Sequence, residues 1–138
     1  MIFSSINTVS VIVSAVAGFL FGGVWYGVLS KAWIEAAGLT EAQIKGTGGP
    51  NPAPLLLAFG ANLVMGYMLS ALLGAQAPYG ILQGATMGVL IAAGFVLTTL
   101  VVNHTFQQAR RTLTLIDGGH WLGVLAVQGA VLGWFSGG

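Results

Sequence analysis

Charged residues are scarce in this sequence. Only 5% of its 138 residues are Asp, Glu, Lys or Arg, whereas a water-soluble domain carries roughly a quarter. All of them lie in two windows, residues 31–45 and 110–117, and residues 1–30, 46–109 and 118–138 have none. The composition therefore excludes an ordinary water-soluble domain. With 56% hydrophobic residues and a mean hydropathy of +0.89, it predicts an integral membrane protein.

Cysteine is absent, which excludes a disulfide framework and thiol chemistry but does not fix the compartment. Runs of basic residues that could bind a phosphate backbone are also missing, so we expect no nucleic-acid partner. The sequence has no nucleophile elbow, Walker loop, dinucleotide fingerprint or HExxH zinc motif. We therefore expect a protein that is not an enzyme, with no catalytic residues, no metal and no cofactor.

Long apolar stretches are what the sequence does contain. Four can be delimited, at about residues 9–29, 54–75, 80–106 and 113–135. Each reaches the ~20 residues that a membrane-spanning helix needs, and each is continuously apolar, whereas a membrane barrel strand alternates. We predict an all-α polytopic membrane protein, with residues 1–138 forming a single domain of four transmembrane helices in a tight bundle. No Lys or Arg precedes the first stretch, so we expect a span there and not a cleaved signal peptide.

The sequence contains a weak internal repeat. Gly18-Phe19-Leu20 resembles Gly94-Phe95-Val96, and residues 60–63 resemble residues 118–121 in the same way. This pattern indicates two helical hairpins related by a parallel duplication, a theme known from transporters. The alternative is chance, because Gly and apolar residues are common throughout.

The basic residues predict the orientation in the membrane. With four spans, the first and third connections emerge on one face, and they hold Lys31, Lys45, Arg110 and Arg111. The opposite face, with both termini and the turn at residues 76–79, has no Lys or Arg. By the positive-inside rule, the charged loops are cytoplasmic, with these four residues as basic anchors, and both termini are external.

The first connection shows local signals of its own. Gly38 is placed to end a helical extension of the first span, in the position that favours a left-handed glycine. Thr40 and Gln43 have the spacing of a capping box, which predicts a short surface helix after Thr40. Residues 46–52, rich in Gly and Pro, end that helix.

Small residues at intervals of four form the densest pattern in the apolar stretches. In lipid, helices associate through close backbone contact at such residues. The first span carries two adjacent rows, and we expect one of them to face another chain. Packing within this chain alone is the alternative. The residues expected at helix contacts are Gly18, Gly22, Gly23, Gly27, Gly66, Ser70, Gly74, Gly80, Gly84, Gly88, Gly129 and Gly133.

Polar side chains inside the membrane are costly, so each needs a partner or a function. Helical rise places several of them at a similar depth near the charged loops. They could form a hydrogen-bonded plug, with Asp117 paired to Arg110 or Arg111, or a proton or ion site. Trp25 and Tyr26 also suit anchors at the membrane interface. The predicted intramembrane polar cluster is Trp25, Tyr26, Asn62, Asn103, His104, Asp117 and His120.

Several short segments share a pattern with a known family: Val24–Tyr26, Lys31–Ile34, Gly38–Thr40, Gly94–Val96, Thr98-Thr99, Asn103–Phe106 and Leu115–His120. On these segments the chain resembles the bacterial membrane family called domain of unknown function 1761. The resemblance covers about residues 15–133 and departs from the family pattern at Gly27-Val28 and at Asp117. It implies a four-span fold, in a bacterial inner membrane, and no established activity.

These observations favour a small membrane protein that acts through helix–helix association, as a homo-oligomer or as an accessory subunit of a membrane complex. Its partners would be the lipid bilayer and other membrane chains. The alternative function is a transporter or channel for a small solute or ion, with the polar cluster near its cytoplasmic mouth. Such a path must cross the bilayer, and only Gln83, Thr86 and Gln128 are polar candidates toward the outer half.

Overall fold

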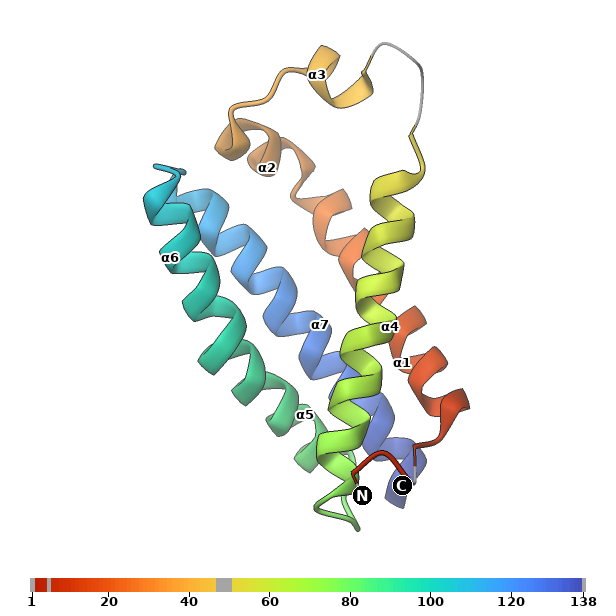
Figure 1. Cartoon of the computed structure of the whole chain (residues 1–138). Helices are drawn as coiled ribbons and strands as arrows, with labels where there is room; N and C mark the ends of the chain where they lie inside the picture. Colours follow the sequence, from red (N-terminus) through yellow and green to blue (C-terminus); the bar gives the residue numbers. More distant parts are fainter. Residues whose placement is uncertain (1, 5, 47–50, 138) are drawn as a thin grey trace.

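The computed structural model describes residues 2–4, 6–46 and 51–137 (Figure 1). Within them no strand occurs, and α5, η1 and α6 follow one another without a break, η1 being a stretch of π-helix. The elements in chain order are α1 (Thr8–Val28), α2 (Ser30–Ala37), α3 (Glu41–Lys45), α4 (Ala53–Gly74), α5 (Ile81–Ile91), η1 (Ala92–Leu97), α6 (Thr98–Phe106) and α7 (Arg111–Gly137).

Four helices are long and apolar enough to cross a membrane. They run over Thr8–Val28, Ala53–Gly74, Ile81–Phe106 and Arg111–Gly137. The shortest has 21 residues, which at about 1.5 Å per residue spans the ~30 Å hydrocarbon core. This confirms the prediction of an all-α protein with four membrane-spanning helices.

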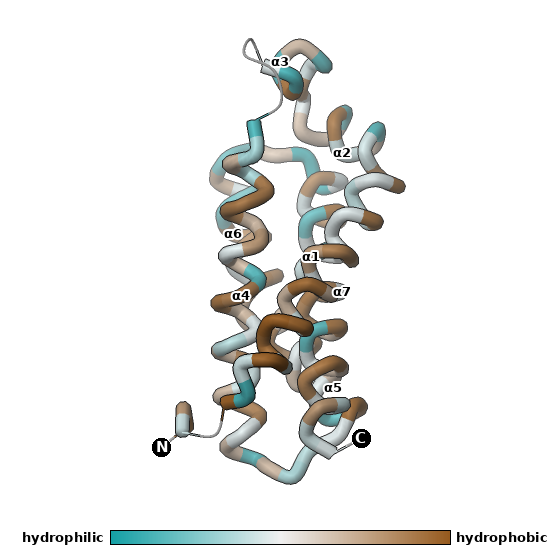
Figure 2. Tube along the Cα trace, turned by 90° about the vertical axis from the view of Figure 1, so that its right-hand side faces the viewer, coloured by the Kyte–Doolittle hydropathy of each residue, from teal (hydrophilic) through white to brown (hydrophobic). Residues whose placement is uncertain are grey.

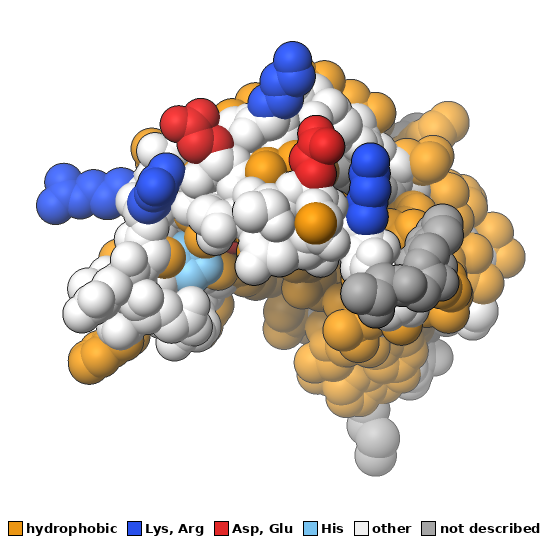
Figure 3. All heavy atoms as spheres, turned by 90° about the horizontal axis from the view of Figure 1, so that it is seen from above, with side chains coloured by type: hydrophobic (Ala, Val, Ile, Leu, Met, Phe, Trp, Pro, Cys, Tyr) orange, Lys and Arg blue, Asp and Glu red, His pale blue; other side chains and the backbone are white. Residues whose placement is uncertain are grey.

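Helix α7 is the element against which the other spans pack. It contacts α1, α4, α5, η1 and α6, while α1 and α4 also pack against each other. Both termini and the turn between α4 and α5 lie at one end of the molecule, here called the terminal end (Figure 1). Helices α2 and α3 and the connection from α6 to α7 lie at the other, the charged end, where Lys, Arg, Asp and Glu side chains gather (Figure 3).

The closest backbone contact lies between α5 and α7. A Cβ added at Gly84 would collide with the Gly129 carbonyl, and one added at Gly88 would collide with the carbonyl of Leu125. Gly133 stands in the same relation to the Gly80 carbonyl. Because lipid offers no hydrophobic drive for helix association, contact of this kind must hold the two helices together.

The hydrophobic core of the bundle lies toward the terminal end. Val11, Leu69, Leu73 and Leu132 form a buried cluster there. Toward the charged end, α4 and α6 expose large side chains, so that hydrophobic residues cover the bundle along its length (Figure 2). These side chains are between 53% and 87% exposed: Leu55, Leu56, Leu57, Val101, Val102 and Phe106.

The first connection follows its predicted local structure. Gly38 ends α2 with φ +69° in the left-handed region, where glycine lacks the usual steric penalty. Thr40 and Gln43 form the predicted capping box at the start of α3. Residues 47–50 of the predicted break lie outside the described part of the chain.

Candidate functional site

The polar cluster near the charged end is centred on Asp117 of α7. The Tyr26 hydroxyl donates a hydrogen bond of 2.6 Å to Asp117 Oδ1. His104 Nε2 lies 4.0 Å from Asp117 Oδ2, and His104 Nδ1 is 2.9 Å from the Thr114 hydroxyl. These contacts connect α1, α6 and α7, so the cluster joins three of the four spans.

Trp25 and His120 lie beside this cluster. The Trp25 indole donates to the Ile116 carbonyl over 3.0 Å. The His120 ring packs against those of Tyr26 and Trp121, with centroids 4.7 and 4.5 Å apart. Both Trp25 and Tyr26 therefore make polar contacts inside the bundle, in addition to any role as interface anchors.

Three expectations about the cluster differ from the structure. Asn103 is exposed, because His104 points toward α7 and neighbouring side chains on a helix point about 100° apart. Asp117 is not paired with an arginine among the described residues, and Arg110 donates instead to the Glu35 carbonyl over 2.9 Å. Asn62 is buried but belongs to a second polar group deeper in the bundle.

That second group lies where α1, α4 and α7 meet. Gln128 is fully buried and its amide nitrogen donates to the Asn62 carbonyl and to Asn62 Oδ1, at 2.9 and 3.2 Å. Gly18 makes room for this pair, since a Cβ there would stand 2.5 Å from Asn62 Oδ1. Gly66 makes room for Ser14 in the same way, since a Cβ there would stand 2.7 Å from the Ser14 hydroxyl oxygen.

Every buried polar side chain in the described residues lies on these three helices, two on each. We call this line of side chains the polar seam. Two atoms of the seam, His120 Nδ1 and Gln128 Oε1, are buried without a hydrogen-bond partner among the described residues. The members of the polar seam are Ser10 and Ser14 of α1, Asn62 and Ser70 of α4, and His120 and Gln128 of α7.

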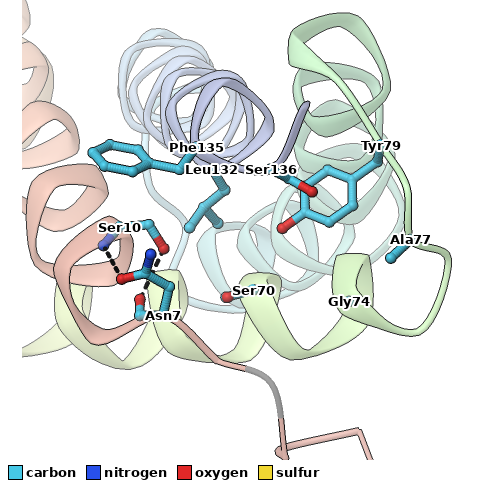
Figure 4. Close-up of a pocket in the computed structure, with 9 residues that line it drawn as sticks. All are labelled: Asn7, Ser10, Ser70, Gly74, Ala77, Tyr79, Leu132, Phe135 and Ser136. Atoms are coloured by element: carbon cyan, nitrogen blue, oxygen red, sulfur yellow. Dashed lines mark hydrogen bonds between the residues drawn. The ribbon is translucent and has the colours of Figure 1, made fainter. Parts of the chain in front are cut away.

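Each end of the polar seam opens into a cavity. The terminal cavity, of about 260 Å³, is drawn in Figure 4, where Ser70, Tyr79 and Leu132 lie around it. The inner cavity, of about 300 Å³, lies nearer the charged end. The terminal cavity is lined by Asn7, Ser10, Ser70, Gly74, Ala77, Tyr79, Leu132, Phe135 and Ser136. The inner cavity is lined by Phe19, Gly22, Gly23, Tyr26, Leu55, Ala58, Asn62, His120 and Trp121.

A short constriction separates the two cavities. On α4, Asn62 lines the inner cavity and Ser70 the terminal one, and Gly66 lies midway between them. Ser14 and Gln128 are the polar side chains beside Gly66, and both are fully buried. The seam is therefore closed in the middle of the bundle over about two turns of helix, at ~5.4 Å per turn.

Sequence reasoning did not find the polar seam. Ser70 stands among the predicted packing residues, Asn62 and His120 among the predicted polar cluster, and Gln128 among three outer polar candidates, so the six were not predicted as one group. A signal was present, because the two polar residues on each helix are four or eight positions apart. Such spacings place both side chains on one face of a helix.

The structure brings no three His, Cys, Asp or Glu side chains of the described ranges close enough to hold a metal ion. Four apolar helices, long enough to cross a membrane and packed as a bundle, define an integral membrane protein. The chain belongs to the family described as Protein of unknown function (DUF1761), which matches residues 9–133. No curated protein and no solved structure matches it.

Proposed function

We propose that the protein is a small transporter or channel that passes a small uncharged solute along the polar seam. One observation carries this proposal: two cavities lie on the same line of buried polar side chains and are separated by a single constriction at Ser14, Gly66 and Gln128. A solute with hydrogen-bonding groups would meet polar partners at each step. No charged side chain lines either cavity, so an ion would lack compensation there.

Among the side-chain hydrogen bonds of the seam in the described residues, only those from Gln128 to Asn62 join two helices. Ser10 and Ser14 donate to carbonyls of their own helix, and Asn62 donates to Ala58 within α4. Such bonds within a helix contribute nothing to holding helices together. Unpaired polar atoms in a bilayer cost several kcal/mol each, so the two in the seam indicate groups that bind a passing molecule.

The test is solute flux into liposomes that contain the purified protein. Stopped-flow light scattering with urea, glycerol or resorcinol should show faster swelling than in empty liposomes for at least one solute. Gln128→Leu should abolish the increase, because it removes the polar side chain of the constriction. Thr86→Val is the matched control, since Thr86 is exposed on α5, away from the seam. The proposal would be contradicted if liposomes with the protein swelled no faster than empty liposomes for every solute. A swelling rate of the Gln128→Leu variant equal to that of the wild type would also contradict it.

A second function, helix–helix association, is favoured by a separate observation. Gly23 and Gly27 on α1 have no atom within 4 Å of an added Cβ, while Gly18 and Gly22 on the same helix face close neighbours. This open pair of glycines would allow another membrane helix to approach closely. The protein would then be a homo-oligomer or an accessory subunit, and neither function involves a catalytic step.

A further inference from the structure

The inner cavity has the position and size of a site for a small ligand. Its volume of about 300 Å³ is at the low end of the ~300–1,000 Å³ of small-molecule pockets. Leu55, 62% exposed, and Gly23, also exposed, lie at its rim between α1 and α4. A ligand can therefore reach the cavity sideways from the surrounding lipid.

Four of the nine residues that line the cavity carry aromatic rings. Phe19, Tyr26 and Trp121 contribute rings, and His120 lies between Tyr26 and Trp121. Glycine and alanine at Gly22, Gly23 and Ala58 leave the space between these rings open. Flat aromatic walls favour a flat aromatic ligand, because ring pairs gain energy beyond the area they bury.

A few polar groups interrupt this apolar wall. His120 is 8% exposed and its Nδ1 has no partner among the described residues. The Tyr26 oxygen donates to Asp117 but retains lone pairs that can accept a hydrogen bond. The ligand therefore needs a hydrogen-bonding group, and it must be neutral because none of the lining residues carries a formal charge.

We propose that the inner cavity binds a small neutral aromatic molecule that carries hydroxyl groups and enters from the bilayer. The ring lies among Phe19, Tyr26 and Trp121, and a hydroxyl pairs with His120. The same molecules would be the substrate class of the pathway proposed above, and in that respect the inference rests on the proposed function. Binding itself requires no passage, so the two can be tested apart.

The test is a ¹⁹F NMR titration of 4-fluorophenol with the full-length protein in detergent, with empty micelles as the baseline for partitioning. The wild type should bind 4-fluorophenol saturably. Fluorobenzene, which has the same ring without the hydroxyl, should bind about tenfold more weakly, as expected for one buried hydrogen bond. Absence of saturable binding, or equal affinity for the two probes, would overturn the inference.

Matched variants locate the bound probe. Gly23→Leu projects a side chain over the cavity, and Gly27→Leu places the same side chain one turn away, outside the lining. Both positions have open space for a Cβ, so both variants should fold. Binding should be lost in Gly23→Leu and kept in Gly27→Leu, and Ala58→Phe should abolish it from the opposite wall. Unchanged binding in Gly23→Leu and Ala58→Phe would overturn the assignment of the site.

The outcomes for the site and for the pathway are distinguishable. Saturable binding of 4-fluorophenol with no solute flux would leave the site standing and overturn the pathway. Flux that depends on Gln128, without saturable binding at the inner cavity, would leave the pathway standing and overturn the site.

Discussion

Tyr26 and Asp117 join two helices near the charged end through one short hydrogen bond. Tyr26 of α1 donates over 2.6 Å to Asp117 of α7, and His104 Nε2 of α6 lies 4.0 Å from the same carboxylate. Removing the Tyr26 hydroxyl and removing the Asp117 charge are therefore different perturbations. The first leaves a half-buried oxygen without its partner, and the second keeps an oxygen that accepts the same bond.

We expect Tyr26→Phe to destabilise the protein by about 1–3 kcal/mol, the cost of a buried acceptor left unpaired. Asp117→Asn should cost about 1 kcal/mol or less, because the amide oxygen still accepts from Tyr26. Thermal unfolding in detergent measures both, and Tyr26→Phe should have the lower Tm. A Tyr26→Phe variant as stable as the wild type would show that the hydrogen bond does not stabilise the fold.

The sequence located polar residues along the chain better than it located their partners. Tyr26, His104 and Asp117 share a depth that helical rise alone supplies. The pairing of Asn62 with Gln128 depends on how α4 and α7 are rotated about their axes. The spacing of the polar residues indicates which face of each helix turns inward, but not which residue of a facing helix lies opposite, so the partner of Asn62 could not be predicted.

Whole elements were predictable where a length or a cap defines them. Four spans follow from the length of uninterrupted apolar sequence, and the start of α3 follows from the capping box at Thr40 and Gln43. The π-helical stretch η1, Ala92–Leu97, has no comparable signal, since its residues also suit an ordinary α-helix. The glycine rows indicated close contacts, but not which helix faces each row.

Two glycines of different helices should respond differently to the same substitution. Gly84→Leu should prevent folding, because even the Cβ of a residue at position 84 would collide with the Gly129 backbone. Gly27→Leu should fold normally and instead weaken association with other chains, because nothing lies within 4 Å of an added Cβ. Analytical ultracentrifugation in detergent and copurification measure association. An unchanged oligomer size and unchanged copurification in Gly27→Leu would contradict the association function.

The molecule as a whole has its charge at one end, and this asymmetry predicts its orientation. We propose that the charged end faces the cytoplasm of a bacterial cell and that both termini are external, because Lys31, Lys45, Arg110 and Arg111 all lie in the connections at the charged end. A reporter fused after Arg111 should be active in the cytoplasm, and one fused at the C-terminus should be active outside. A cytoplasmic C-terminus would contradict this orientation.

Both termini lie at the same end of the molecule (Figure 1). A tandem gene duplication that joins the end of one copy to the start of the next would therefore need only a short linker. The product would be an eight-span chain whose halves have the same orientation, which is the arrangement of parallel repeats in larger transporters. An inverted pair could not arise from such a fusion without an additional span. The even number of spans thus limits which larger architectures this unit can produce by gene fusion.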